Sequence, residues 1–318
     1  MRHPLFLAAA LLLGAALFAP AVLLAQDGTS TTATGISRSM NPAISVNGLF
    51  RGQASRDDTS ADLNGFMIDG VEAQFSAVVD PFWRADVLIG MHPEHSDHSD
   101  HGDEAEEGHG ADRGVDGEGA YVDGRALPGG LGLKLGKFAL PFGKHAPLHM
   151  HQYPFADAPV AVSSIFGDHL LSDTGALGAV TMPFPWYSDV QVYAVDGGAM
   201  PFDGTSKSVA AGGRFVNLWD LTEDSTVELS GSYTQGPDAR HPGENLKMGV
   251  YGADLTWKWV SSARTRGPAL NVTLEALWPD YEESEGTPQG WYALAQYRFH
   301  RNWWAGVATG QYDSCLLY

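Results

Sequence analysis

The sequence predicts an all-β fold, a transmembrane antiparallel β-barrel of the outer-membrane type. Three observations predict it. Apolar and polar residues alternate along many segments of roughly ten residues, aromatic residues gather at the ends of the apolar faces, and short connections alternate with long ones. The composition agrees, because glycine (38 residues) and aromatic residues (11%) are abundant while charged residues make up only 18%.

The alternation is clearest in residues 250–259. Tyr251 and Leu255 fall on one face of an extended segment, and Asp254 and Lys258 fall on the other. Successive side chains of a strand point to opposite sides, so each such segment has one apolar and one polar face. The same pattern recurs, with varying clarity, in residues 70–79, 84–91, 131–137, 189–195, 225–233, 270–278 and 291–299.

Alternating strands also build soluble sandwiches, which hide their apolar faces between two sheets. The aromatic residues and the connections favour the membrane barrel, which has aromatic girdles, short periplasmic turns and long external loops. The aromatic residues are Trp257, Trp259, Trp278, Trp291, Phe299 and Trp303. Short connections are expected at 80–83, 127–130, 183–188, 221–225 and 300–302, and long ones at 54–64, 91–117, 139–173, 197–208, 235–247 and 280–289.

The pattern gives about 13 visible strands, whereas single-chain bacterial barrels normally have an even number. The last alternating segment is followed by SCLLY at 314–318. The odd count therefore predicts either a C-terminally truncated barrel or one further strand near the N-terminus.

The N-terminus has the layout of a secretory signal peptide: Arg2, a long apolar run and then small residues. We expect a signal peptide at 1–25, a periplasmic lead at 26–41 and the barrel at 42–318, in the bacterial outer membrane. A retained membrane anchor is the alternative for the first segment. The formal charge of −19 argues against a nucleic-acid partner, and the single cysteine excludes an internal disulfide.

The stretch MHPEHSDHSDHGDEAEEGHG at 91–110 carries a histidine at every third position over its first half. Imidazole suits zinc, copper and nickel, and carboxylates can assist. On an external loop, 91–117, such a tract would capture metal through several exchangeable geometries. A solvated acidic loop with no metal is the alternative. The candidate ligands are His92, His95, His98, His101, His109, Asp97, Asp100 and Asp103.

A second candidate lies in the long connection 139–173, which contains His145, His149 and His151. His149 and His151 are two residues apart, so in an extended segment they would point the same way and could share a metal ion. The alternative is that these side chains pack and hydrogen-bond within a constriction loop. In either case we expect the connection to narrow a pore.

Four segments carry a resemblance to a known group: NPAISVNGLFRGQ, VEAQFSAVVDPFWRADVLIG, LPGGLGLKLGKFALPFGKHAPLHMHQYPFADAP and LSDTGALGAVTMPFPWYSDV. Residues 40 to 313 resemble bacterial outer-membrane proteins related to the phosphate-selective porin O and P group, some of whose relatives are labelled zinc-regulated outer-membrane receptors. The resemblance implies a diffusion channel, a homotrimer and a long loop folded into the lumen.

The inferred inward face does not favour phosphate, because acids are mixed with bases along it. Carboxylate rings favour cations, and lysine or arginine rings favour anions. The residues expected to line the pore are Glu72, Arg84, Asp86, Lys134, Glu228, Asp254, Lys258, Glu275 and Arg298.

These observations predict a passive outer-membrane pore for small solutes or ions, in contact with outer-membrane lipid. Its external loop would capture a divalent metal such as Zn²⁺, and no cofactor is required. An enzyme is not expected, because neither G-x-S-x-G nor H-E-x-x-H occurs. The alternatives are a general outer-membrane or surface β-barrel with no metal role, and a secreted soluble β protein.

We predict that the histidine-rich tract binds zinc and that replacing His92, His95, His98 and His101 with Asn weakens this binding. Since neutral imidazole is the ligand, the affinity of the unchanged protein should also fall below pH ~6.5. Calorimetric titration of the full chain with zinc on either side of that pH measures both effects, with Ser96→Ala/Ser99→Ala as the control. Equal affinity before and after the four substitutions would show that the tract is not a metal site.

Overall fold

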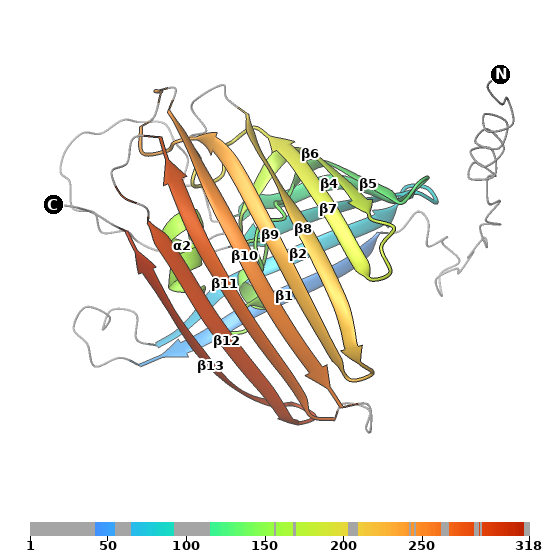
Figure 1. The fold of residues 1–318 in the computed structure, drawn as a ribbon, viewed down its shortest axis with the longest axis vertical. Helices are drawn as coiled ribbons and strands as arrows, with labels where there is room; N and C mark the ends of the chain where they lie inside the picture. The colour runs from blue at the N-terminus through green and yellow to red at the C-terminus, as the bar shows by residue number, and fades with distance from the viewer. Residues whose placement is uncertain are drawn as a thin grey trace, which may run out of the picture. The chain divides into compact units, whose positions relative to one another are not determined.

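The computed structural model describes residues 42–54, 65–91, 115–155, 157–167, 170–202, 209–241, 243–244, 246–261, 267–282, 286 and 288–314. The expected signal peptide and lead, 1–41, lie outside them. Within the described residues, thirteen strands form one antiparallel sheet in sequence order (Figure 1). The strands are β1 (Ala43–Gln53), β2 (Gly65–Val78), β3 (Trp83–Met91), β4 (Val115–Leu127), β5 (Leu131–Ala139), β6 (Ser172–Thr181), β7 (Tyr187–Val195), β8 (Ala210–Thr222), β9 (Ser225–Pro237), β10 (Lys247–Val260), β11 (Ala269–Tyr281), β12 (Gln289–His300) and β13 (Trp303–Asp313).

The antiparallel all-β prediction and its count of about thirteen strands are confirmed. Across the described part of the chain, each strand pairs with its sequence neighbours, and β1 and β13 are not paired with each other. No helix among these residues is both long enough and apolar enough to cross a membrane.

The two faces of the sheet differ in polarity, as the alternation requires. On β10, Asp254 and Thr256 are each 2% exposed, whereas Tyr251 is 49% exposed. The register keeps like beside like, because Asp254 pairs with Glu275 on β11. Buried polar residues of the inner face are Asp69, Glu72, Asp86, Asp123, Asp189, Ser230, Ser232, Asp254, Thr256, Thr273 and Glu275. Apolar residues exposed on the outer face include Val46, Phe50, Val87, Leu135, Val192, Phe215, Leu229, Leu274 and Val307.

Register shifts interrupt several of the ladders, and two of them, the β-bulges in the β1–β2 and β3–β4 ladders, each turn a carboxylate inward. In the β1–β2 ladder, Leu49 pairs with Gly70 and Phe50 with Ile68, so Asp69 is the extra residue. A bulge re-aims the side chain of the extra residue. Unbroken alternation would place Asp69 on the apolar face, but it is buried, with Arg51 Nε 3.0 Å from its Oδ2.

The second bulge lies in the β3–β4 ladder. Leu88 pairs with Gly119 and Ile89 with Gly117, which leaves Glu118 as the extra residue. Counting back from the inward Asp123, strict alternation would again turn this carboxylate toward the apolar face. Instead, its side chain is 11% exposed and faces the interior.

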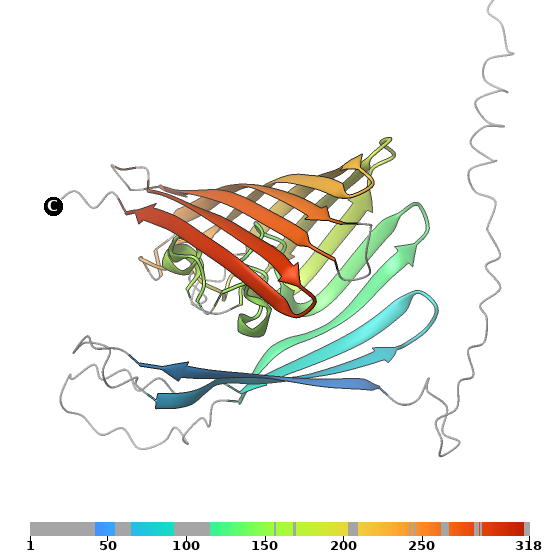
Figure 2. The same ribbon diagram turned by 90° about the horizontal axis from the view of Figure 1, so that it is seen from below.

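The connection between β5 and β6, residues 140–171, packs against the inner face. It contains a 3₁₀ helix, η3 (Met150–Gln152), and an α-helix, α2 (Val160–Phe166). Helix α2 contacts β11, β12 and β13, and η3 contacts β1. Figure 2 shows the sheet curving around this connection, so that α2 lies on its concave side.

Apolar side chains hold the connection in place. Leu140, Phe142 and Ile165 from the connection join Tyr292 and Leu277 of the strands in one buried cluster. Two strand glycines let the connection approach the sheet closely. A Cβ atom at Gly252 would lie 3.0 Å from the Phe142 ring, and one at Gly290 would lie 2.7 Å from the Cβ of Ala161.

We predict that Gly252→Val loosens the connection, because its side chain would occupy the space of the Phe142 ring. Overpacking of this kind typically costs about 1–3 kcal/mol. Limited proteolysis of the refolded protein should show faster cleavage within 140–171. The control is Ala253→Val, whose side chain is on the exposed outer face. Equal cleavage rates for both variants would mean that Phe142 does not anchor the connection.

Candidate functional site

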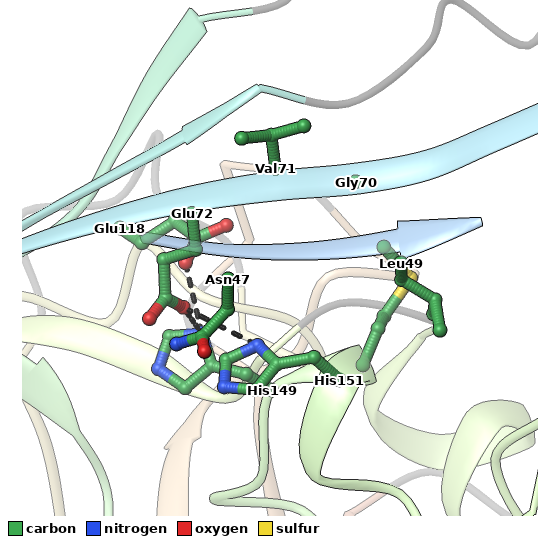
Figure 3. Close-up of a pocket in the computed structure, with 9 residues that line it drawn as sticks. Asn47, Leu49, Gly70, Val71, Glu72, Glu118, His149 and His151 are labelled. Carbon is green, nitrogen blue, oxygen red and sulfur yellow. Dashed lines mark ion pairs between the residues drawn. The ribbon is translucent and has the colours of Figure 1, made fainter. Parts of the chain in front are cut away.

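The inner face, together with the connection laid on it, forms the candidate site. At one end of it, Glu72 of β2, Glu118 of the β4 bulge and His149, which precedes η3, meet (Figure 3). His149 Nδ1 lies 2.7 Å from Glu72 Oε2 and 2.8 Å from Glu118 Oε2. Three separate segments thus bring two carboxylates to one imidazole nitrogen.

Burial and charge oppose each other at His149. Its side chain is 12% exposed, and burial alone would lower its pKa. The hydrogen bond to Glu118 and the charges of Glu72 and Glu118 outweigh burial, so the net effect raises the pKa of His149. The protonated ring offers one Nδ1–H to two carboxylate oxygens.

His151 lies beside this cluster. Its ring stacks on the His149 ring with the centroids 5.6 Å apart, and its Nδ1 is 3.9 Å from Glu72 Oε2. Burial, followed by the charge of His149, lowers the pKa of His151. The neutral imidazole is therefore favoured there. The extended geometry expected for 149–151 is replaced by a 3₁₀ turn that begins after His149.

His145 lies elsewhere in the connection. Its ring packs 4.4 Å from the ring of Tyr153 and 6.1 Å from that of Tyr292, between centroids. Burial lowers the pKa of His145 to about 4, which keeps the ring neutral at physiological pH. Among the described residues, His145 is not in the group whose donor atoms could share one ion.

A second cluster of charges lies in the middle of the inner face. Arg214 Nη2 donates to both carboxylate oxygens of Asp254 at 3.1 Å and lies 3.5 Å from Glu228 Oε1. Lys144 of the connection is 2.6 Å from Glu228, and Ser230 donates to Asp254 at 2.6 Å. Two cations therefore neutralise two acids, and one cation comes from the connection itself.

Glu275 is the point at which the connection is pinned to β11. Its carboxylate is 3% exposed and accepts hydrogen bonds from the Tyr292 hydroxyl and from the backbone N–H of Lys144. Gly143 passes so close that a Cβ atom there would lie 1.8 Å from Glu275 Oε1, and its φ is +58°. Only glycine fits this backbone position.

A third charged cluster extends over β3, β4 and β5. Arg84 Nη2 lies 2.7 Å from Asp86, and Arg125 Nε lies 2.5 Å from Asp123. The ammonium of Lys134 sits 4.7 Å from the centre of the Tyr121 ring. Oppositely charged neighbours thus alternate across the inner face.

Seven of the nine predicted pore-lining residues take part in the contacts described above, and Lys258 and Arg298 do not. Glu72 belongs to the His149 cluster, Glu228 and Asp254 share Arg214, and Arg84 pairs with Asp86. Lys258 is exposed. Arg298 donates to the Gly267 carbonyl at 2.9 Å.

Sequence reasoning missed Asp69, Glu118, Arg214 and Tyr292. For Glu118 a signal exists, because it stands between two glycines at 117–119, a combination typical of an irregular strand. Residues 92–114, which hold the histidine-rich candidates, lie outside the described residues, so metal capture there stays a prediction.

No protein-family model and no curated protein matches the sequence. Among solved structures, the chain is similar to the outer-membrane protein OmpT of Vibrio cholerae, which was folded in vitro and is in its trimer form. The two sequences are 10% identical, the match covers 86% of this chain and 89% of that chain, and the TM-score is 0.41. It is also similar to the outer-membrane channel DcaP of Acinetobacter baumannii, to which it is 9% identical. That match covers 89% of this chain and 93% of that chain, with a TM-score of 0.42.

We predict that Tyr292→Phe destabilises the folded chain by about 1–3 kcal/mol, because the buried Glu275 carboxylate loses a hydrogen-bond donor. Denaturant unfolding of the refolded protein, followed by tryptophan fluorescence, measures the difference. Tyr297→Phe is the matched control, since Tyr297 is 42% exposed on the outer face. Identical midpoints for the two variants would contradict the assigned role of Tyr292.

Proposed function

We propose that this chain forms an outer-membrane β-barrel pore through which small solutes or ions diffuse passively. The observation that carries the proposal is the two-faced sheet, with carboxylates buried on one side and large apolar side chains exposed on the other. An apolar surface of this extent is unfavourable in water, and a bilayer is the solvent that suits it. A polar interior with an apolar exterior is the arrangement of membrane barrels.

The aromatic side chains support the same orientation. Tyr251 pairs with Tyr233 on one side and Trp278 on the other, giving an aromatic row across three strands. Trp257 and Trp259 lie toward the other end of β10. Tyr251 and Trp259 are about 27 Å apart along the strand at ~3.4 Å per residue, or about 20 Å along a membrane normal after a typical strand tilt. This span is close to the ~25 Å apolar band of outer-membrane barrels.

The connection 140–171 would narrow the pore from within. Two of its residues contact strands near opposite edges of the sheet: Asp157 pairs with Arg51 of the edge strand β1 at 3.1 Å, and the Pro154 carbonyl accepts from Gln296 of β12, the neighbour of the other edge strand, at 3.0 Å. The strands therefore curve around this segment, and solutes would pass between it and the charged inner face. Such a constriction suits small solutes.

The lining favours cations weakly. Each described basic cluster is matched by carboxylates, and the Glu72–Glu118 pair adds negative charge at one end. Rings of carboxylates favour cations, so this lining is a poor fit to a phosphate-selective channel. Zinc capture by the tract 92–109 and the homotrimer implied by the resemblance remain predictions that accompany the pore.

We predict stable conductance steps from the refolded protein in planar bilayers, with a modest preference for cations. Lys144→Glu should raise the cation-to-anion permeability ratio severalfold, because it replaces the positive charge that the connection places beside Glu228. Lys247→Glu makes the same charge change at an exposed residue at the start of β10 and should leave the ratio near that of the unchanged protein.

Folding is checked by heat-modifiable migration on a gel. If the folded protein gives no conductance steps, the pore proposal is wrong. If it conducts but Lys144→Glu leaves the ratio unchanged, solutes do not pass beside Glu228.

A further inference from the structure

We propose that Glu72, Glu118 and His149 bind one divalent transition-metal ion of the zinc class, which fastens the connection 140–171 to the wall of the sheet. One donor atom from each residue lies within 4.8 Å of the other two. Imidazole nitrogen and carboxylate oxygen are both good ligands for such ions. None of these three residues belongs to the tract 92–109, and the proposal does not depend on the pore function.

Charge supports a metal ion at this position. Two carboxylates face one imidazole here, and the three side chains are between 9% and 12% exposed. Buried charge is costly unless it is compensated. A divalent cation held by both carboxylates and the imidazole would balance the two negative charges of the carboxylates.

The geometry requires only small movements. His149 already presents Nδ1 to both carboxylates, at 2.7 and 2.8 Å. Zinc–ligand distances of ~2.1 Å place tetrahedral donor atoms about 3.4 Å apart, so each contact would lengthen by well under 1 Å. A cavity of about 30 Å³ adjoins the cluster and is lined also by Asn47 and His151. It leaves room for a water molecule at the fourth position.

The bulge at Glu118 is an independent observation. Regular alternation would have left this carboxylate on the apolar face. The bulge brings it to Glu72 and His149, and the pairing between β3 and β4 becomes irregular there. Bulges that re-aim a side chain are common next to functional sites. Glu72 and His149 alone would already form an ion pair, and the bulge adds a second carboxylate to the same imidazole nitrogen.

The test begins from a full-length background variant in which His92, His95, His98, His101 and His109 are all Asn, so that the external tract no longer binds metal. Equilibrium dialysis of this refolded protein against zinc, with elemental analysis, gives the stoichiometry and affinity. Absorption of the Co²⁺-loaded protein reports the coordination geometry. We expect one ion per chain and a tetrahedral Co²⁺ spectrum.

In this background, Glu118→Gln and His149→Gln should each weaken zinc binding by at least about a hundredfold, since even outer partners of metal ligands change affinity by about 10–100-fold. The control is Asp189→Asn, which removes a buried carboxylate that accepts a hydrogen bond from Gln191 on β7 and should keep the ion. Zinc should also slow proteolysis within 140–171 in the background variant but not in Glu118→Gln.

Heat-modifiable migration on a gel establishes that each variant folds. If Glu118→Gln does not fold, His149→Gln decides whether the site binds the ion. The proposal is overturned if the folded background variant binds no zinc. It is also overturned if a folded ligand variant binds zinc as tightly as the background variant does. Conductance is not used as a readout, so loss of the metal site and loss of the pore remain separate results.

Discussion

The structure depends on one constraint, which is that polar and apolar side chains alternate along strands paired in a fixed register. A slip of one residue in any ladder would turn buried carboxylates such as Asp254 into the apolar face and expose the opposite side chains to the interior. Neighbouring strands therefore keep Asp254 beside Glu275 and Leu255 beside Leu274. The bulges at Asp69 and Glu118 change this phase locally, and each brings an acid inside.

Burying so many carboxylates on one face requires compensation, and the connection 140–171 supplies much of it. Lys144 brings a positive charge to Glu228, its backbone N–H reaches Glu275, and His149 sits between Glu72 and Glu118. The apolar side chains of the connection fill the rest of the interior. The same contacts that stabilise the fold thus fix the width and charge of the proposed pore, and the proposed metal ion would add one more tie between connection and wall.

Periodicity predicted the fold because each strand buries one face, and a period of two then reports directly on the structure. The same reasoning placed Glu72 and Asp254 inward from the sequence. It could not place Glu118, because a bulge is set by the pairing of β3 with β4, which no single segment encodes. Tyr292 could not be predicted for a different reason. A tyrosine in an apolar run gives no sign in the sequence that its hydroxyl will donate to a buried acid on the neighbouring strand.

The central claim is that the apolar face meets lipid while the polar face lines a water-filled interior. The most direct test places one spin label at a time on residues 254 to 259 of β10 in the refolded, bilayer-embedded protein with Cys315 replaced by Ser. Collision rates with oxygen, which concentrates in lipid, and with a water-soluble nickel chelate are then measured. The account predicts that oxygen accessibility peaks at 255, 257 and 259 and falls at the residues between them. Uniform access of the nickel chelate to the odd-numbered positions would contradict it and would indicate a soluble β protein.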